Sequence, residues 1–291
     1  MKNAHNNYGE NQEQGAHWNS SMGRAWVNND SKMNAQLQII TNDLYKEIKI
    51  QKGSNVLDIG CGSGALLPFL SDKVGNSGLV HGVDISNPLL ELAKKYHCAK
   101  ENITFLNADA QSYNFKSLNY DNVVSRFGVM FFADPMAAFK NIRSSMKNNG
   151  KLNFVCWSKL EDNDFFVMPL KIVLRHLNKP LPTPSKSPGP LSFSDPDHTE
   201  HILKSSGFKS VAIKTVKTKM INYDTIENQI QLFNKIGLAA RIKKEASFDK
   251  GLFSFTPRIF FLISFHFKFF PPPPIVKIVL GYLPPISDIF L

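Results

Sequence analysis

The sequence predicts an α/β fold with a doubly wound, mostly parallel sheet, and two observations lead to this prediction. Between residues 55 and 157, short apolar runs alternate with amphipathic runs, which is typical of parallel strands joined by helices that cover both faces of the sheet. The first apolar run also leads directly into three glycines at alternate positions, in "NVLDIGCGSGALLPFL" at residues 55–70. Such a turn between a strand and a helix is typical of a ligand-binding loop.

Length, composition and charge narrow the class of protein. A length of 291 residues allows one large domain, or one domain with an appendage. Cys61, Cys98 and Cys156 show neither paired nor metal-ligand spacing, which is typical of the reducing cytoplasm, and the polar N-terminus has no signal-peptide pattern. The net charge is +10, and the excess Lys and Arg residues are scattered outside the glycine-rich half. In a nucleic-acid-binding protein, these residues would more often cluster in a stripe. We therefore expect a cytoplasmic protein with no nucleic-acid partner.

Each predicted element follows from its residue pattern. Residues 1–30 are rich in Asn and Gln and carry Trp18 and Trp26, and residues 31–50 repeat apolar residues at helical spacing. Five strands are expected at residues 55–60, 78–86, 102–109, 120–127 and 151–157. The helices between them are expected at residues 64–74, 87–98 and 134–150. A further helix and a half-exposed strand are expected at residues 195–208 and 209–221.

Three segments interrupt or follow this alternation. Residues 158–200 begin with a helical piece and become rich in proline, and residues 224–245 have a helical pattern. We expect both segments to form a wall for a substrate. From residue 251 the composition shifts to Phe, Ile and Pro, and proline and charged residues interrupt its first apolar run, at residues 252–270. This run therefore does not predict a stable membrane span.

The residues around the glycine turn predict a nucleoside-binding site. Gly60, Gly62 and Gly64 leave a backbone that a ligand can approach closely, and Asp84, 20 residues after Gly64, suits the hydroxyls of a ribose. A nicotinamide cofactor would fit these residues as well. Two details argue against it: the glycines follow G-x-G-x-G rather than G-x-G-x-x-G, and Asp58 would repel a pyrophosphate. The same carboxylate would attract the cationic amino-acid end of S-adenosylmethionine.

On these motifs the chain resembles the class I S-adenosylmethionine-dependent methyltransferases, in particular the bacterial small-molecule branch related to the ubiquinone and menaquinone C-methyltransferases. The resemblance rests on "VLDIGCGSG", "GVDIS", "NADAQSYNF" and the stretch from "YDNVVSRF" to "KLNFVCW", and it covers about residues 15 to 245. It implies a Rossmann-like sheet, S-adenosylmethionine as the methyl donor, and a small-molecule acceptor.

The resemblance also implies roles for individual residues. Asp58 would order the glycine loop and reach the amino group of the donor, and Asp84 would hold the ribose. The other implied residues belong to the glycine loop, the adenine pocket, the methyl-donor pocket and an N-terminal cover: Gly60, Gly62, Gly64, Ile85, Asp109, Ala110, Arg126, Phe127, Trp18 and Trp26. Cys61 is interpreted as a small filler rather than a nucleophile, and the spacing of the histidines predicts no metal site.

The absence of one motif limits the type of molecule that could accept the methyl group. Enzymes that methylate exocyclic amino groups typically carry an Asn/Asp-Pro-Pro-aromatic turn after the fourth strand, where this chain has "SRFGVM". The resemblance therefore favours an oxygen or a carbon of an apolar or aromatic small molecule. No general base is identified, and His17, Tyr113 and Arg126 are candidates by position alone. Two alternatives stay open: a donor-binding relic without turnover, and a nicotinamide-dependent oxidoreductase.

The C-terminal tail departs from the family, in which a seventh strand comes last and inserts antiparallel between strands five and six. No such strand is recognised after residue 250, and the abrupt change in composition indicates a frameshifted or degenerate end. We therefore expect strand six to lack its partner, with residues 258–265 as a poor substitute. The predicted organisation is a cover at residues 1–30, a methyltransferase domain at residues 31–245 and an atypical tail at residues 251–291.

Overall fold

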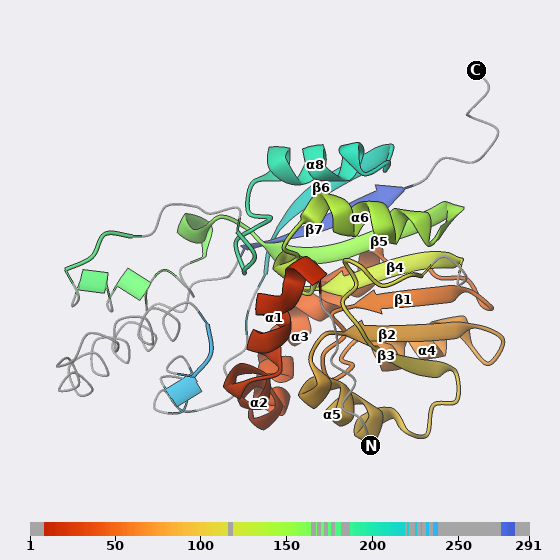
Figure 1. Cartoon of the computed structure of the whole chain (residues 1–291), viewed down its shortest axis with the longest axis horizontal. Coiled ribbons are helices and arrows are strands. Elements are labelled where there is room, and N and C mark those ends of the chain that lie inside the picture. Colours follow the sequence, from red (N-terminus) through yellow and green to blue (C-terminus); the bar gives the residue numbers. More distant parts are fainter. Residues whose placement is uncertain are drawn as a thin grey trace.

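A seven-stranded sheet forms the centre of the computed structural model, which describes residues 9–115, 119–163, 187–218 and 275–282, with isolated positions between 167 and 181 and between 220 and 237 (Figure 1). The strands follow the order β3-β2-β1-β4-β5-β7-β6, and only β7 runs antiparallel to its neighbours. The strands are β1 (Asn55–Ile59), β2 (Leu79–Asp84), β3 (Ile103–Asn107), β4 (Tyr120–Arg126), β5 (Met146–Trp157), β6 (Ser210–Lys217) and β7 (Ile275–Tyr282). The predicted α/β fold is confirmed.

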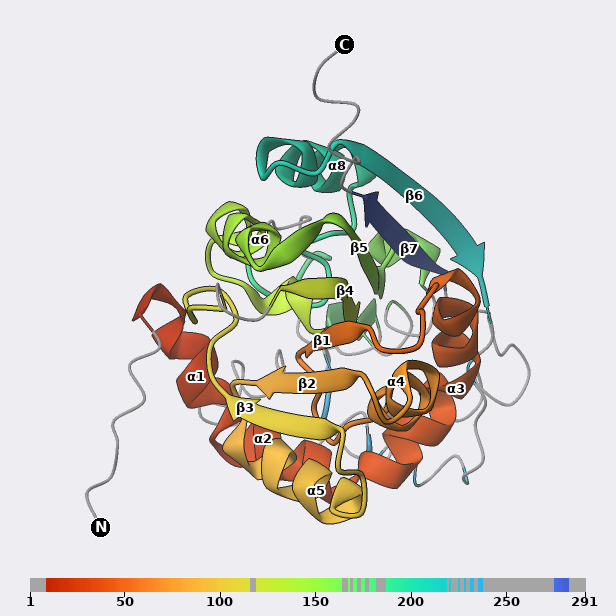
Figure 2. The same cartoon turned by 90° about the vertical axis from the view of Figure 1, so that its right-hand side faces the viewer.

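Helices cover both faces of this sheet, with α3 and α4 on one face and α6 and α8 on the other (Figure 2). The α-helices are α1 (Gln12–Trp18), α2 (Ser21–Asn28), α3 (Asp30–Glu47), α4 (Leu67–Val74), α5 (Asn87–His97), α6 (Pro135–Ser144) and α8 (Pro196–Ser205). Short 3₁₀ turns occur at η1 (Gly9–Asn11), η2 (Val129–Phe131) and η3 (Leu160–Asp162). Both α6 and α8 begin with an Asp-Pro pair, because the aspartate side chain caps the helix and the proline suits its first turn.

The core lies on the two sides of the central strands. Val56, Leu57, Val123 and Phe154 are inaccessible to solvent, as expected for parallel strands with helices on both faces. His81 also lies in this core, where its Nδ1 is 3.0 Å from the hydroxyl of Tyr120 and burial lowers the pKa of the imidazole. This histidine is therefore a neutral, hydrogen-bonded core residue.

The expectation that strand six lacks a partner is wrong. β7 occupies the position between β5 and β6, where Val155 pairs with Ile278 and Ile213 pairs with Val279. Ile278 and Val279 are buried. The strand was missed because it follows four consecutive prolines, although "IVKIVLGY" is rich in the β-branched residues that favour strands. Residues 258–265 lie outside the described residues, and the division into cover, domain and tail stays a prediction.

One predicted boundary is also wrong. The helix expected over residues 134–150 ends at Ser144, and β5 begins at Met146. The pairing with β4 passes from Tyr120 opposite Met146 to Asn122 opposite Lys151, so residues 147–150 form an irregular excursion. The sequence "KNNG" has low helical propensity, which explains the early end of the helix.

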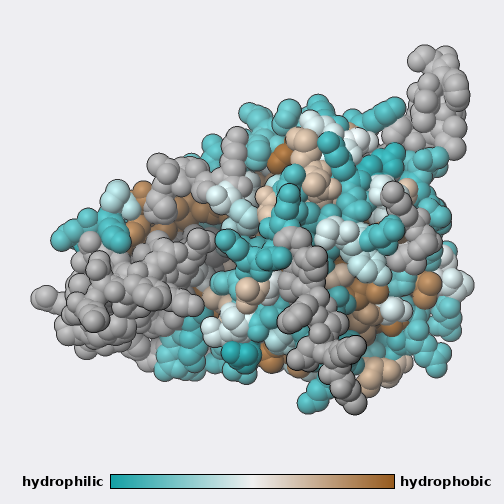
Figure 3. All heavy atoms as spheres, viewed as in Figure 1, coloured by the Kyte–Doolittle hydropathy of each residue, from teal (hydrophilic) through white to brown (hydrophobic). Residues whose placement is uncertain are grey.

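On the side drawn in Figure 3, hydrophilic residues predominate and hydrophobic ones form small, separate groups. Among the described residues, none of the helices combines the length and the apolar character needed to cross a bilayer. The same residues contain no group of His, Cys, Asp and Glu side chains that could hold a metal ion.

Candidate functional site

The glycine loop after β1 packs backbone against backbone on the loop after β4. Gly60 has a φ of 65°, and a Cβ there would lie 2.6 Å from the Cα of Gly128. A Cβ on Gly128 would in turn lie 2.4 Å from the carbonyl oxygen of Ile59. Gly62 has a φ of 57° and faces open space, with no atom within 4 Å of an added Cβ. Glycine is therefore needed for close packing at Gly60 and Gly128 and for the backbone conformation at Gly62.

Asp84 holds this loop through its backbone. The side chain is buried at the end of β2, where Oδ2 accepts a hydrogen bond from the N–H of Gly62 at 2.7 Å and Oδ1 accepts one from the N–H of Ser86 at 2.8 Å. Burial raises the pKa of this carboxyl to about 6, against the opposing effect of these hydrogen bonds. Each carboxylate oxygen keeps a further lone pair that could accept a hydrogen bond from a ligand.

Asp58 is a buried carboxyl group without a hydrogen-bond partner. Its side chain is 1% exposed, and among the described residues neither of its oxygens accepts a hydrogen bond. Burial raises the pKa of this carboxyl well above its usual range, and Arg126 opposes this shift. Buried polar groups are almost always hydrogen-bonded. A ligand with a cationic group could therefore supply the hydrogen-bond donor that the Asp58 carboxyl lacks.

A polar network joins α3 to the glycine loop and to β4. The guanidinium of Arg126 donates to Oγ1 of Thr41 at 3.0 Å and to Oδ1 of Asn34 at 2.6 Å. The amide of Asn34 donates to Oδ1 of Asp30 at 2.9 Å, and the hydroxyl of Ser63 donates to the same oxygen at 2.5 Å. We call these five residues the α3 network. It fixes the position of Arg126 next to Asp58 and ties the glycine loop to the helix.

The N-terminal helices pack on the loops that follow β2 and β4. The side-chain amide of Asn19 donates to the carbonyl of Ile85 at 2.9 Å, and the hydroxyl of Ser86 donates to the carbonyl of Trp18 at 2.9 Å. The indole of Trp18 contacts Phe131 edge-on at 5.1 Å and Trp26 at 6.0 Å between ring centroids. The segment therefore packs on the loops after β2 and β4, which is a position that suits the predicted cover.

The loop after β3 brings Asp109 and Ala110 to the same edge of the sheet. Asp109 is buried, and its Oδ1 accepts hydrogen bonds from the N–H of Gln111 at 3.0 Å and from the side-chain amide of Asn11 at 3.1 Å. The carbonyl of Ala110 accepts from the amide of Asn141 at 3.1 Å. Asp109 thus both shapes its own turn and contacts the start of the N-terminal segment.

Phe127 adopts a strained backbone conformation where β4 ends. Its φ is 66°, which is rare for a residue other than glycine and is typical of functional sites. Two contacts hold it there: its N–H donates to the carbonyl of Val155 at 3.0 Å, and its ring stacks on Trp157 at 4.5 Å between centroids. An aromatic wall therefore borders the carboxyl ends of β4 and β5.

The other candidates have ordinary environments. Cys61 is buried, and burial raises the pKa of its thiol well above the usual range, which disfavours a nucleophilic role. Its sulfur fills the space beside Gly82, where an added Cβ would lie 2.9 Å away. His17 contacts the ring of Trp18 edge-on, and Tyr113 packs on Phe115. None of these contacts identifies a general base.

Sequence reasoning missed the helix residues of the α3 network. Residues 31–50 were judged by their apolar spacing, and the polar positions were left aside. Asp30, Asn34 and Thr41 are four and seven residues apart, which places all three on one face of a helix with 3.6 residues per turn. This polar stripe is the signal that could have found them.

Comparisons with known proteins show that part of the chain is similar to methyltransferases. The family described as "Methyltransferase domain" matches residues 56–150. The chain is 35% identical over 104 residues to aklanonic acid methyltransferase DauC of Streptomyces sp. (strain C5), over 35% of this chain and 47% of that protein. It is 32% identical over 107 residues to demethylmenaquinone methyltransferase of Staphylococcus aureus (strain MRSA252), over 37% of this chain and 44% of that protein.

The chain therefore spans slightly less than half the length of these curated relatives. Among solved structures, a Haloferax volcanii protein in complex with the Trm112 methyltransferase activator superposes with a TM-score of 0.53 and 16% identity, over 94% of this chain and 98% of that one. At this identity the likeness concerns the fold alone.

Proposed function

We propose that the chain is a class I S-adenosylmethionine-dependent methyltransferase related to the quinone methyltransferases, and that it transfers a methyl group from S-adenosylmethionine to a small molecule. The observation that carries the proposal is Asp58, a buried carboxyl with no hydrogen-bond partner among the described residues. A ligand with a free ammonium group would supply the missing partner. A dinucleotide would bring an anionic pyrophosphate to the same place, which the negative charge disfavours.

The other residues at this edge also fit S-adenosylmethionine. Asp84 would accept hydrogen bonds from the ribose hydroxyls, and the backbone at Gly62, which is open toward solvent, would border the methionine part. Asp109, Ala110 and Ile85 would border the adenine. When bound, S-adenosylmethionine supplies a methyl group that its sulfonium already activates.

The residues of the chain would then bind, align and shield the reactants. The stacked rings of Phe127 and Trp157 would orient an acceptor at the ends of β4 and β5, and such alignment supplies roughly 7–11 kcal/mol. Trp18 and Phe131 would close the site from the N-terminal side and exclude water.

We further propose that the acceptor is an apolar or aromatic small molecule, methylated on oxygen or carbon. Three observations support this. The aromatic wall offers little to a polar amine, and β4 leads into the turn η2 without an Asn/Asp-Pro-Pro-aromatic sequence. The two relatives are named for aklanonic acid and demethylmenaquinone, which are small molecules.

Calorimetric titration of the full chain with S-adenosylhomocysteine tests the proposal, with NADH as the matched control. We expect saturable binding of one S-adenosylhomocysteine per chain and no binding of NADH. Transfer of a labelled methyl group to a panel of quinones and aromatic phenols then separates an enzyme from a relic, which would bind the donor without turnover. Binding of NADH but not of S-adenosylhomocysteine would overturn the proposal.

A further inference from the structure

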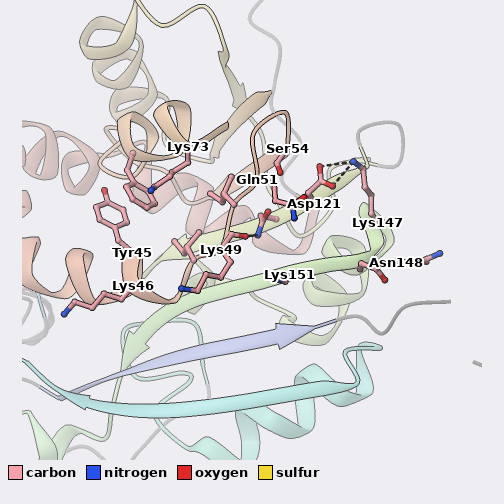
Figure 4. A pocket seen from close by; sticks show the side chains of 15 residues that line it. Tyr45, Lys46, Lys49, Gln51, Ser54, Lys73, Asp121, Lys147, Asn148 and Lys151 are labelled. Atoms are coloured by element: carbon pink, nitrogen blue, oxygen red, sulfur yellow. Dashed lines mark hydrogen bonds and ion pairs between the residues drawn. The ribbon is translucent and has the colours of Figure 1, made fainter. Parts of the chain in front are cut away.

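A cavity of about 850 Å³ opens at the amino ends of the central parallel strands, whereas the glycine loop lies at their carboxyl ends (Figure 4). It is bordered by the end of α3, the loop before β1, α4, the start of β4 and the start of β5. Ser54, which lines it, immediately precedes β1, whereas the glycine loop follows the end of that strand. A molecule in this cavity would therefore lie at the other end of β1 from Gly60, apart from the proposed donor site.

Lysine side chains dominate the lining of this cavity, which we call the lysine pocket. The lysines are Lys46, Lys49, Lys73, Lys147 and Lys151, and Asp121 is the one acidic residue among the lining residues. Figure 4 shows these side chains around the hollow, with Lys73 on α4, Lys46 on α3, and Lys147 and Lys151 on β5. Such a concentration of one sign of charge in a concave site favours an anionic occupant.

Nearby carboxylates neutralise only part of this charge. Asp121 pairs with Lys147 at 2.8 Å, and its other oxygen also accepts the N–H of Asn55 at 2.9 Å. Lys46 pairs with Asp43 at 2.7 Å. In the part of the chain that the structure describes, no carboxylate pairs with Lys49 or Lys73, and the ammonium of Lys73 lies 5.5 Å from the ring centre of Phe69.

Helix dipoles account for two of the lysines and leave the others unexplained. Lys46 and Lys73 lie in the last turns of α3 and α4, where a cation also interacts favourably with the helix end. Lys49, Lys147 and Lys151 lie outside the helices. Their convergence on one cavity therefore needs a different reason.

We propose that the lysine pocket binds a small oligophosphate, either an inorganic chain or the polyphosphate part of a nucleotide. Lysine ammonium groups bind phosphate as point charges, and several of them match the several charges of an oligophosphate. Asn148, Asn149 and Gln51 add exposed amides that can donate hydrogen bonds. The size of the cavity is that of a site for a compact ligand.

The walls of the pocket favour a compact ligand over a long polymer. Tyr45 and Phe69 stack on one another at 3.8 Å, with an interplanar angle of 15°, and form an aromatic border. Ile48 and Ile50 add apolar surface beside the lysines. A nucleic acid would instead need a charged groove that tracks along its backbone.

Calorimetric titration of the full chain with sodium tripolyphosphate, at physiological salt, tests the proposal. We expect saturable binding of one tripolyphosphate per chain, unchanged when S-adenosylhomocysteine is present. The double variant Lys49→Ala/Lys73→Ala should bind about tenfold more weakly, because two exposed charge contacts, each of modest strength, are lost together. The matched control Lys95→Ala/Lys140→Ala removes the same charge from exposed positions outside the pocket and should bind as the wild type does.

The other arms identify the source of the phosphate and keep the test falsifiable. ATP that binds more tightly than tripolyphosphate would assign the pocket to nucleotides, and weaker binding of ATP would assign it to inorganic oligophosphates. Lys49→Arg/Lys73→Arg, which keeps both charges, should retain binding. Equal loss in both alanine double variants, or no saturable binding by the wild type, would overturn the proposal, as would equal affinity for orthophosphate and tripolyphosphate. Urea unfolding of each variant verifies that it is folded.

Discussion

Replacing Asp84 by Asn should remove a loss of stability that the wild type undergoes as pH rises, while it weakens donor binding. Burial in the folded state raises the pKa of Asp84 to about 6 from its ordinary value of 3.8. A difference of about 2 pKa units corresponds to about 3 kcal/mol between the two protonation states. The unfolded chain loses this proton near pH 4, and the folded chain keeps it until about pH 6. The stability of the wild type should therefore fall as pH rises through this window.

An asparagine has no proton to lose, but its Nδ2 cannot accept one of the two backbone N–H bonds that Asp84 accepts from Gly62 and Ser86. Asp84→Asn should therefore be less stable than the wild type near pH 4 by about 1–3 kcal/mol. This deficit in the free energy of unfolding should shrink by up to about 3 kcal/mol above pH 6, where the wild type has lost the proton. Donor binding should weaken, because each charge-assisted hydrogen bond to the ribose is worth about 1.5–3 kcal/mol. We expect the affinity for S-adenosylhomocysteine to fall by at least about tenfold.

Urea unfolding in a pH series and calorimetric titration with S-adenosylhomocysteine measure the two effects. Asp72→Asn is the matched control, since Asp72 is an exposed acid paired with Lys100, and it should change neither quantity appreciably. A difference in stability between the variant and the wild type that stays the same from about pH 4 to about pH 7 would refute the energetic argument about burial. Unchanged affinity would refute the assignment of Asp84 to the ribose.

Three further substitutions or truncations test other parts of the account. Gly128→Ala places a Cβ 2.4 Å from the carbonyl oxygen of Ile59, and urea unfolding should show a loss of about 1–3 kcal/mol; a loss below about 0.5 kcal/mol would mean that the two loops yield easily. Arg126→Lys removes the fork that reaches both Thr41 and Asn34, so affinity for S-adenosylhomocysteine should fall severalfold, and an unchanged affinity would separate the α3 network from the donor site. Removal of residues 1–28 should weaken the same affinity while circular dichroism still reports a folded sheet; normal binding by the truncated chain would reduce the segment to an appendage.

The motif-bearing half of the fold could be predicted because each strand there has a local signal. β1 to β4 combine an apolar run with a polar end, and the loops at the ends of β1 and β2 carry Gly60 and Asp84. β7 lacked such a signal, because its place depends on partners far away in the sequence and "FFPPPP" obscured the run of β-branched residues. The start of β5 was missed for a related reason, since only the pairing of Met146 with Tyr120 reveals it.

A candidate site could be proposed from the sequence where a residue type in its context has one main chemical use. Asp58 next to the glycines suggested a cationic ligand, and its burial without a partner is a feature that only the structure could add. The contacts that position Arg126 depend on α3 crossing the sheet, and helical spacing alone does not specify them. The positive φ of Phe127 could not be predicted from the sequence. Residues other than glycine rarely adopt positive φ values, so a phenylalanine gives no indication of one.

The pH dependence of S-adenosylhomocysteine binding, measured on the wild type and on Asp58→Asn, tests the central claim most directly. Burial raises the pKa of Asp58 well above its usual range, and the ammonium of the ligand interacts favourably only with the ionised carboxylate. The affinity of the wild type should therefore rise with pH as the Asp58 carboxyl ionises, for as long as the ligand ammonium stays charged. Asp58→Asn should bind weakly and lose most of this pH dependence, retaining the part that comes from Asp84. An affinity that is independent of pH in the wild type, or undiminished in Asp58→Asn, would contradict the account.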